Sequence, residues 1–124
     1  MEDTLKLKHK RFIDARDVLV HCARRKTRIT YQELSDAAHL GFNMNMTPDR
    51  KQMGLLLFEI AKFEDRCNRP CLCVLAVNKS GPREGKPGPG FWKMAEALEL
   101  NPDEESQDTF LVTETKRVWQ HWEK

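Results

Sequence analysis

The sequence predicts a mainly helical α+β fold, formed by a single domain over residues 1–124. Apolar residues recur at helical spacing through most of the chain. Only one short apolar run, CLCVLAVN at residues 71–78, has the composition and the flanking turn residues of a buried strand. A chain of 124 residues is long enough to bury one hydrophobic core, and we find no internal repeat or linker composition that would divide it.

The first predicted helix covers residues 6–26. Its apolar residues recur three or four positions apart, which is typical of an amphipathic helix that packs one face on a core. They are Phe12, Ala15, Leu19 and Cys22, with Ala23 beside them. The segment RRKTRI is expected to end this helix.

The second predicted helix lies in ITYQELSDAAHLG, residues 29–41, and has signals at both ends. Thr30 is the predicted N-cap, and Glu33 follows three residues later, so each side chain can accept a hydrogen bond from the other residue's backbone N–H. Gly41 is predicted to end the helix, because glycine adopts the left-handed conformation of that position without steric cost.

The third predicted helix opens with Thr47 as its N-cap and Pro48 as its first residue. Its apolar stripe is wide, so we expect this helix to be central in the fold. The stripe contains Met53, Leu56, Leu57, Ile60, Phe63 and Cys67, and it is widened by Leu55 and Phe58.

The apolar run at residues 71–78 is the predicted strand, and residues 28–30 are its predicted partner. A third strand could follow near Phe91. Between them lies the basic loop NKSGPREGKPGPG. A helix is predicted in GFWKMAEALEL, and a last helix is predicted to start at Asn101 and Pro102 with an acidic first turn.

The predicted order of elements is helix, strand, helix, helix, strand and loop, which is the order of a winged helix. In that fold the second and third helices form a helix-turn-helix, and the loop after the strand is the wing. We therefore predict a winged-helix-like core with a small two- or three-stranded sheet and additional C-terminal helices.

The distribution of charge predicts a nucleic-acid interface. Residues 1–30 carry a net charge of +5 and residues 67–93 carry +4, whereas residues 94–124 carry −5. If the two basic regions meet in space, they could face phosphates. The predicted DNA-contacting residues are Thr47, Arg50, Lys51 and Gln52 at the start of the third helix and Lys79, Arg83 and Lys86 in the loop.

Two observations count against this interface. The acids Glu59, Glu64 and Asp65 belong to the same helix as the predicted contacts, and the net charge of the whole chain is only +2. The alternative interpretation is that the charges are solvated or paired across the fold, with the loop serving as a simple connection.

The sequence predicts no catalytic residue, metal or cofactor. Cys67, Cys71 and Cys73 lie close together but have no histidine at ligand spacing, and cysteine is among the most buried residue types. Nothing places a base beside Cys71. Pro87 follows Lys86 where a phosphate-binding P-loop needs serine or threonine.

The start of the chain, MEDTLKLKHKRF, is charged where a secretory signal needs an apolar segment. No apolar run is long enough to cross a membrane. We therefore expect a cytoplasmic protein with reduced thiols.

Residues 29–77 resemble the DNA-binding domain of alkylguanine-DNA alkyltransferases and of alkyltransferase-like proteins. ITYQELSDAAHLG is similar to that family's Ile-Thr-Tyr-Gly-Glu-Leu-Ala motif, and KQMGLLL is similar to its Arg-Ala-Val-Gly run. This resemblance implies a winged helix and places Lys51 at the family's base-flipping arginine. RPCLCVLAV is similar to the family's Pro-Cys-His-Arg-Val, which places Cys71 at the alkyl-accepting cysteine.

Leu72 and Cys73 replace the histidine and arginine of that motif, so the resemblance does not imply transferase activity. The second half of the chain, from AVNKSG to VWQHW, resembles small bacterial proteins of no assigned activity.

Two functional hypotheses follow. The first is a non-enzymatic winged-helix-like module that binds duplex DNA mainly through phosphate contacts. The second is a protein-interaction or regulatory module that uses the C-terminal helix, with Trp119 and Trp122, and the acidic tail; a homodimer is one form that it could take. A cysteine-dependent enzyme ranks below both.

Overall fold

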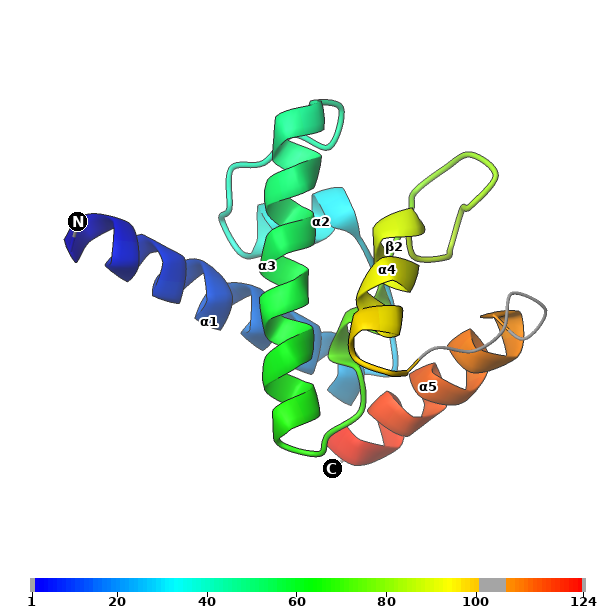
Figure 1. The fold of residues 1–124 in the computed structure, drawn as a ribbon. Coiled ribbons are helices and arrows are strands. Elements are labelled where there is room, and N and C mark those ends of the chain that lie inside the picture. The colour runs from blue at the N-terminus through cyan, green and yellow to red at the C-terminus, as the bar shows by residue number, and fades with distance from the viewer. Residues whose placement is uncertain (1, 101–106, 124) are drawn as a thin grey trace.

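The computed structural model of the protein describes residues 2–100 and 107–123, and most of them are helical (Figure 1). Along the chain the elements are α1 (Glu2–Arg24), β1 (Ile29–Thr30), α2 (Tyr31–Ala37), α3 (Thr47–Arg66), the 3-10 helix η1 (Leu72–Leu75), β2 (Ala76–Val77), α4 (Pro89–Ala97) and α5 (Gln107–Trp122). This architecture confirms the predicted mainly helical α+β class. The predicted start of the last helix at Asn101 and Pro102 lies outside the described residues.

The sheet consists of β1 and β2, which run parallel, with Ile29 opposite Ala76 and Thr30 opposite Val77. The predicted pairing of residues 28–30 with the apolar run is therefore confirmed. The third strand expected near Phe91 was wrong, because that residue lies in α4.

The strand predicted over residues 71–78 was also wrong for most of its length, because Leu72–Leu75 form a 3-10 helix. β1 ends at Thr30, where α2 begins, so only two residues of the run find a partner strand. The residues before them satisfy their own backbone groups instead. The Val74 N–H, for example, donates to the Cys71 carbonyl oxygen at 3.2 Å.

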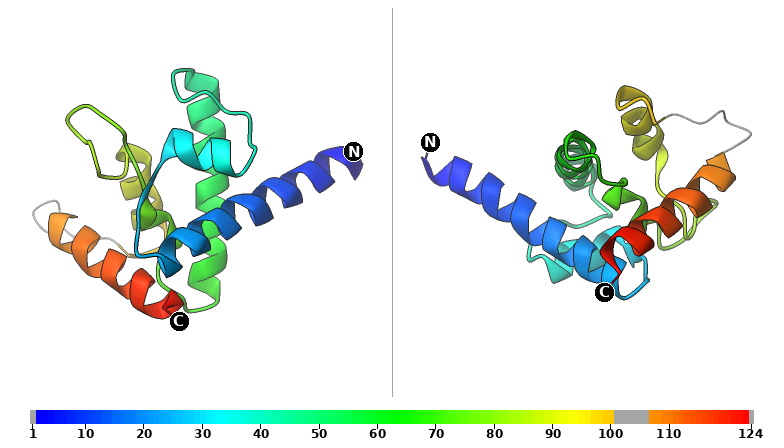
Figure 2. Two further views of the ribbon diagram at one scale, coloured as in Figure 1. Left: turned by 180° about the vertical axis from the view of Figure 1, so that it is seen from behind. Right: turned by 90° about the horizontal axis from the view of Figure 1, so that it is seen from below.

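The centre of the fold is η1, which contacts α1, α3 and α5. Figures 1 and 2 show α1 and α3 crossing on one side of this segment and α5 running along the other. All of residues 71–77 are buried. Because helices cover this segment from several sides, every position must be apolar, and such a run is indistinguishable from a buried strand by its pattern alone.

The capping box predicted at the start of α2 is confirmed. The Thr30 hydroxyl oxygen accepts the Glu33 N–H at 3.2 Å, and the Glu33 carboxylate accepts the Thr30 N–H at 3.0 Å. The end of the helix comes earlier than predicted, at Ala37 rather than before Gly41. His39, not Gly41, takes the first left-handed position after the helix, with φ of 55°.

We expect Thr30→Ala to lower the free energy of unfolding by about 1 kcal/mol, because alanine cannot accept the Glu33 N–H. Thr113→Ala, at an exposed position of α5, is the matched control and should change stability by less than about 0.5 kcal/mol. Urea denaturation of the three proteins measures the difference. A Thr30→Ala midpoint equal to that of the wild type would contradict the contribution of the cap.

The N-cap of α3 differs from the prediction. Met46 takes that position and makes no side-chain capping hydrogen bond, and the helix begins at Thr47. The Thr47 hydroxyl oxygen is used differently, since it accepts a hydrogen bond from Arg50 Nη2 at 2.9 Å.

The buried face of α3 is formed by Met53, Leu57, Ile60, Ala61 and Glu64. The predicted stripe was too wide, because Leu55 and Phe63 are 64% and 41% exposed and Cys67 is also exposed. The core therefore covers only part of the apolar surface of this helix.

Within residues 2–100 and 107–123, no helix combines the length and the apolar composition that a membrane span requires.

Candidate functional site

The seven residues predicted to contact DNA are all exposed, and they lie at one end of the molecule. In Figure 1 the N-terminal end of α3 and the loop at residues 78–88 both project at the top, on the side away from the C-terminal end of α5. The view from behind in Figure 2 shows the same arrangement. We call this surface, made of residues 47–52 and 79–86, the basic end.

At the start of α3, Arg50 is held by two hydrogen bonds. Its Nη1 donates to the Met44 carbonyl oxygen at 3.2 Å and its Nη2 donates to the Thr47 hydroxyl oxygen at 2.9 Å. These contacts orient the guanidinium across the first turn of the helix. Lys51 and Gln52 follow it and are exposed.

The loop at residues 78–88, which we call the hairpin, turns back on itself and is closed by backbone hydrogen bonds. The Asn78 N–H donates to the Lys86 carbonyl oxygen, and the Gly85 N–H donates back to the Asn78 carbonyl oxygen, each at 2.9 Å. Gly81 and Gly85 take left-handed conformations, with φ of 86° and 74°, so the turn needs glycine at these two positions. The hairpin therefore presents Lys79 and Arg83 on a defined backbone.

The base of this hairpin is attached to α2. The Gly88 N–H donates to the Tyr31 hydroxyl oxygen at 2.9 Å, and Pro87 beside it is buried. Burial raises the pKa of the Tyr31 hydroxyl above its ordinary value, so this group stays protonated at neutral pH. No local sequence signal indicates this contact, because the two partners are 57 residues apart.

Acidic groups partly neutralise the basic end. Lys86 Nζ lies 3.0 Å from Asp108 Oδ1, so its charge is paired with α5. The pKa of Glu33 is lowered, first by the hydrogen bond from the Thr30 backbone N–H and also by the positive charge of Lys79. Among the described residues, Lys51, Lys79 and Arg83 make no ion pair within 4.0 Å.

The second basic region of the sequence, at the C-terminal end of α1, does not join the basic end. Lys26 forms an ion pair of 3.3 Å with Glu123, and the Arg28 guanidinium lies 5.6 Å from the ring centroid of Trp119. Figure 1 places this end of α1 near the C-terminus of α5, far from the loop. The condition under which the two regions would face phosphates together is therefore not met at this end of α1.

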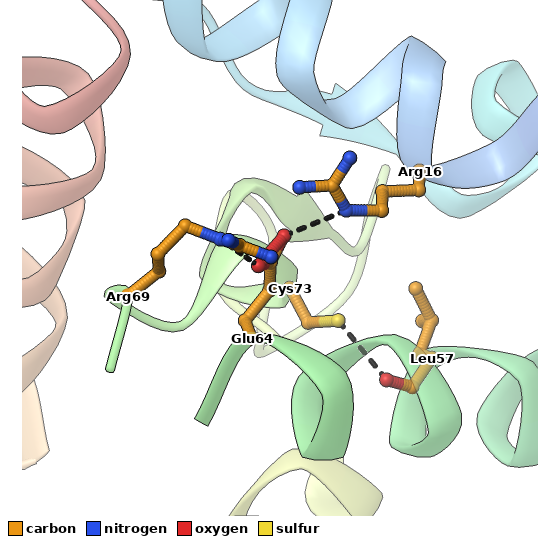
Figure 3. Close-up of polar contacts among 5 residues, drawn as sticks. All are labelled: Arg16, Leu57, Glu64, Arg69 and Cys73. Atoms are coloured by element: carbon orange, nitrogen blue, oxygen red, sulfur yellow. Dashed lines mark hydrogen bonds and ion pairs between the residues drawn. The ribbon is translucent and has the colours of Figure 1, made fainter. Parts of the chain in front are cut away.

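One of the acids counted against DNA binding, Glu64, does not face the solvent. It is fully buried, and its two carboxylate oxygens accept hydrogen bonds from Arg16 Nε at 2.8 Å and Arg69 Nε at 2.5 Å (Figure 3). The guanidinium groups of Arg16 and Arg69 also lie 5.3 and 5.2 Å from the ring centroid of Phe63. This cluster joins α1, α3 and the segment that leads into η1.

A sequence signal for the burial of Glu64 did exist. It follows Leu57 and Ile60 by seven and four residues, so it falls on the buried face of α3. Its partners could not be found in the same way, because Arg16 is 48 residues away.

Cys71 and Cys73 are not activated thiols. Cys71 and Cys73 are buried, and desolvation is the main cause that raises the pKa of Cys71 to about 12 and the pKa of Cys73 well above its ordinary value. The Cys73 Sγ donates to the Leu57 carbonyl oxygen at 3.1 Å, as Figure 3 shows. Because a thiol attacks as its thiolate, this environment disfavours nucleophilic chemistry at Cys71.

Within the described residues, no group of three or more His, Cys, Asp or Glu side chains is arranged to hold a metal ion. Comparisons with protein-family models, with curated proteins and with solved structures find no match for this chain.

The tryptophans do not form an exposed surface. Trp92, Trp119 and Trp122 are half-buried and pack against the core. Trp119 Nε1 donates to the Thr27 carbonyl oxygen at 3.4 Å, which joins α5 to the segment after α1. An interaction surface centred on these tryptophans, as the second sequence hypothesis required, does not follow from this packing.

Proposed function

We propose that the protein is a non-enzymatic module that binds duplex DNA through its basic end. The observation that carries this proposal is that the start of α3 and the hairpin at residues 78–88 project at the same end of the molecule (Figures 1 and 2). The order of elements from α1 to this hairpin is also that of a winged helix. One difference is that α2 and α3 are joined by nine residues, 38–46, which is longer than the turn of an ordinary helix-turn-helix.

Phosphate contacts would supply most of the affinity. The N-terminus of α3 carries the positive end of the helix dipole, and Arg50 and Lys51 add full charges beside it. Lys79 and Arg83 would meet the backbone from the hairpin. Gln52, one residue further along α3, could reach a base edge.

The acids around the basic end limit the expected affinity for DNA. Because Asp108 pairs with Lys86 and Glu33 lies near Lys79, only part of the positive charge is available for counterion release. We therefore expect weak binding with little sequence preference, with a dissociation constant of about 10⁻⁴ M, the weak end of the non-specific range.

The double substitution Lys79→Glu, Arg83→Glu tests this proposal. We expect it to weaken binding to a labelled duplex by at least about tenfold at low salt, and to reduce the slope of log affinity against log salt by about two, because two phosphate contacts are lost. Arg24→Glu, at an exposed position of the other basic region, is the matched control and should bind like the wild type. Equal loss in both variants would contradict the assignment of the hairpin as the contact.

A further inference from the structure

We propose that the groove between α1 and α3 binds one acidic amphipathic α-helix of another protein. This inference goes beyond DNA binding. The groove shares Gln52 of α3 with the basic end, but it contains no residue of the hairpin.

The groove forms where α1 and α3 diverge. The two helices meet at the rings of Phe12 and Phe63, whose centroids are 5.6 Å apart, and at the ion pair of Arg16 with Glu64. Toward the N-terminal ends of both helices a groove of about 460 Å³ opens. Phe12, Phe42, Leu55 and Leu56 provide its apolar lining, and its polar lining consists of His9, Arg11, Gln52 and Glu59.

Apolar side chains on these two helices are unusually exposed. Leu55 in the groove is 64% exposed, Phe63 at the crossing is 41% exposed, and Ile13, next to Phe12 on α1, is 54% exposed. Positions 52, 55, 56, 59 and 63 share one face of α3, a face that the core leaves uncovered. A two-helix groove with this lining suits the apolar face of a third helix, which packs its side chains between the ridges of the other two.

The charges around the groove select the partner. The one acid among its lining residues, Glu59, forms an ion pair of 2.8 Å with Lys62, and Lys10 nearby is paired with Asp14 at 2.7 Å. Arg11, whose guanidinium lies 5.1 Å from the Phe42 ring centroid, makes no ion pair with another described residue, and neither does Lys51 one turn before Leu55. These two unpaired positive charges are complementary to a helix whose polar face is acidic.

The shape of the chain leaves room for such a partner. Figures 1 and 2 show the N-terminal half of α1 extending away from the other helices. Residues 2–13, which form this half, carry four Lys/Arg and two Asp/Glu, for a net charge of +2. An acidic helix in the groove would therefore lie along a weakly basic arm.

The test uses two labelled, designed helical peptides with identical leucine positions on one face, one with glutamates and one with lysines on the other face. Fluorescence anisotropy at low salt measures their binding to the full chain. We expect the acidic peptide to bind at least about tenfold more tightly than the basic one, with the difference shrinking as salt screens the charges. Equal binding of both peptides, or binding of neither, would overturn the proposal.

Two variants locate the site. Leu55→Glu places a charge in the groove at an exposed position, and it should weaken binding of the acidic peptide by at least tenfold without unfolding the protein. Val112→Glu makes the same apolar-to-acidic change at a 51% exposed position of α5, and it should leave binding unchanged. The variant Lys79→Glu, Arg83→Glu should also keep peptide binding, which separates this site from the DNA proposal.

Light scattering tests whether a second copy of the chain occupies the groove. We expect the wild-type chain to be monomeric at the concentration of the peptide assay. A dimer that Leu55→Glu converts to a monomer would show that a second copy of the chain occupies the groove, and it would overturn the assignment of an acidic helix from another protein.

Discussion

Glu64→Ala is expected to lower the free energy of unfolding by about 3–5 kcal/mol, the largest effect of any substitution considered for this protein. The carboxylate is fully buried and is the acceptor for both Arg16 Nε and Arg69 Nε. Removing it leaves two guanidinium groups, each with a side chain only 21–23% exposed, close together without a counter-charge. The link between α1, α3 and the segment before η1 is lost at the same time.

Glu59→Ala is the matched control, because it removes an acid from the same helix at a side chain that is 62% exposed. Its effect should stay within about 0.5 kcal/mol. Glu64→Gln keeps an acceptor oxygen but removes the charge, so its loss in free energy of unfolding should lie between those of the other two variants. It provides the same test if the alanine variant does not fold. Chemical denaturation measures all three. A loss below about 1 kcal/mol for Glu64→Ala would contradict the proposed role of the cluster.

Stability should fall steeply as the pH rises above about 9, because the folded protein keeps protons on buried thiols that the unfolded chain releases. Burial raises the pKa of Cys71 from an ordinary 9.0 to about 12 and raises the pKa of Cys73 as well. Between these pKa values the unfolded state binds fewer protons than the folded state, so each increase in pH favours unfolding. At pH 10 Cys71 alone accounts for a loss of about 1.4 kcal/mol relative to pH 7.

Urea denaturation at pH 7, 8, 9 and 10 measures this dependence. Cys71→Ala should flatten the decline, whereas Thr113→Ala, which removes no titratable group from an exposed position, should leave it unchanged. A wild-type midpoint that stays constant from pH 7 to pH 10 would show that the thiols are not buried as described.

The parts of the fold that could be predicted from the sequence depend on local signals. The capping box of Thr30 and Glu33 was found because its two residues are three positions apart and satisfy each other's backbone groups. The pairing of β1 with β2 was found because residues 71–78 needed a partner and residues 28–30 were the best candidate. The 3-10 helix η1 was missed because an all-apolar run has no period that distinguishes a strand from a buried turn.

The candidate site could be predicted only in part for a related reason. Arg50, Lys51, Lys79 and Arg83 are basic residues at helix starts and turns, so they could be selected from the sequence, and the structure places them at one end of the molecule. The pairing of Lys86 with Asp108, the buried cluster of Glu64 and the contact of Tyr31 with Gly88 join residues 22, 48 and 57 positions apart. Contacts at such separations are decided by how the helices pack, which the local pattern does not contain.

The exposed apolar groove could also be predicted only in part. The stripe on α3 was recognised in the sequence, but all of it was assigned to the core. Leu55 and Phe63 stay exposed because α1 crosses α3 near Glu64 and then diverges from it. The width of an apolar face indicates how much apolar surface the helix has. It does not show whether that surface is buried by the same chain or by a partner.

The most direct test of the DNA-binding account is to follow the backbone amide signals of the isotope-labelled protein by NMR while a duplex is added at low salt. We predict chemical-shift changes concentrated at residues 47–52 and 79–86, with little change at residues 24–28, and a loss of these changes as salt is raised. The absence of any change at protein concentrations of about 100 μM, or changes confined to residues 24–28, would contradict the assignment of the basic end as the DNA-binding surface.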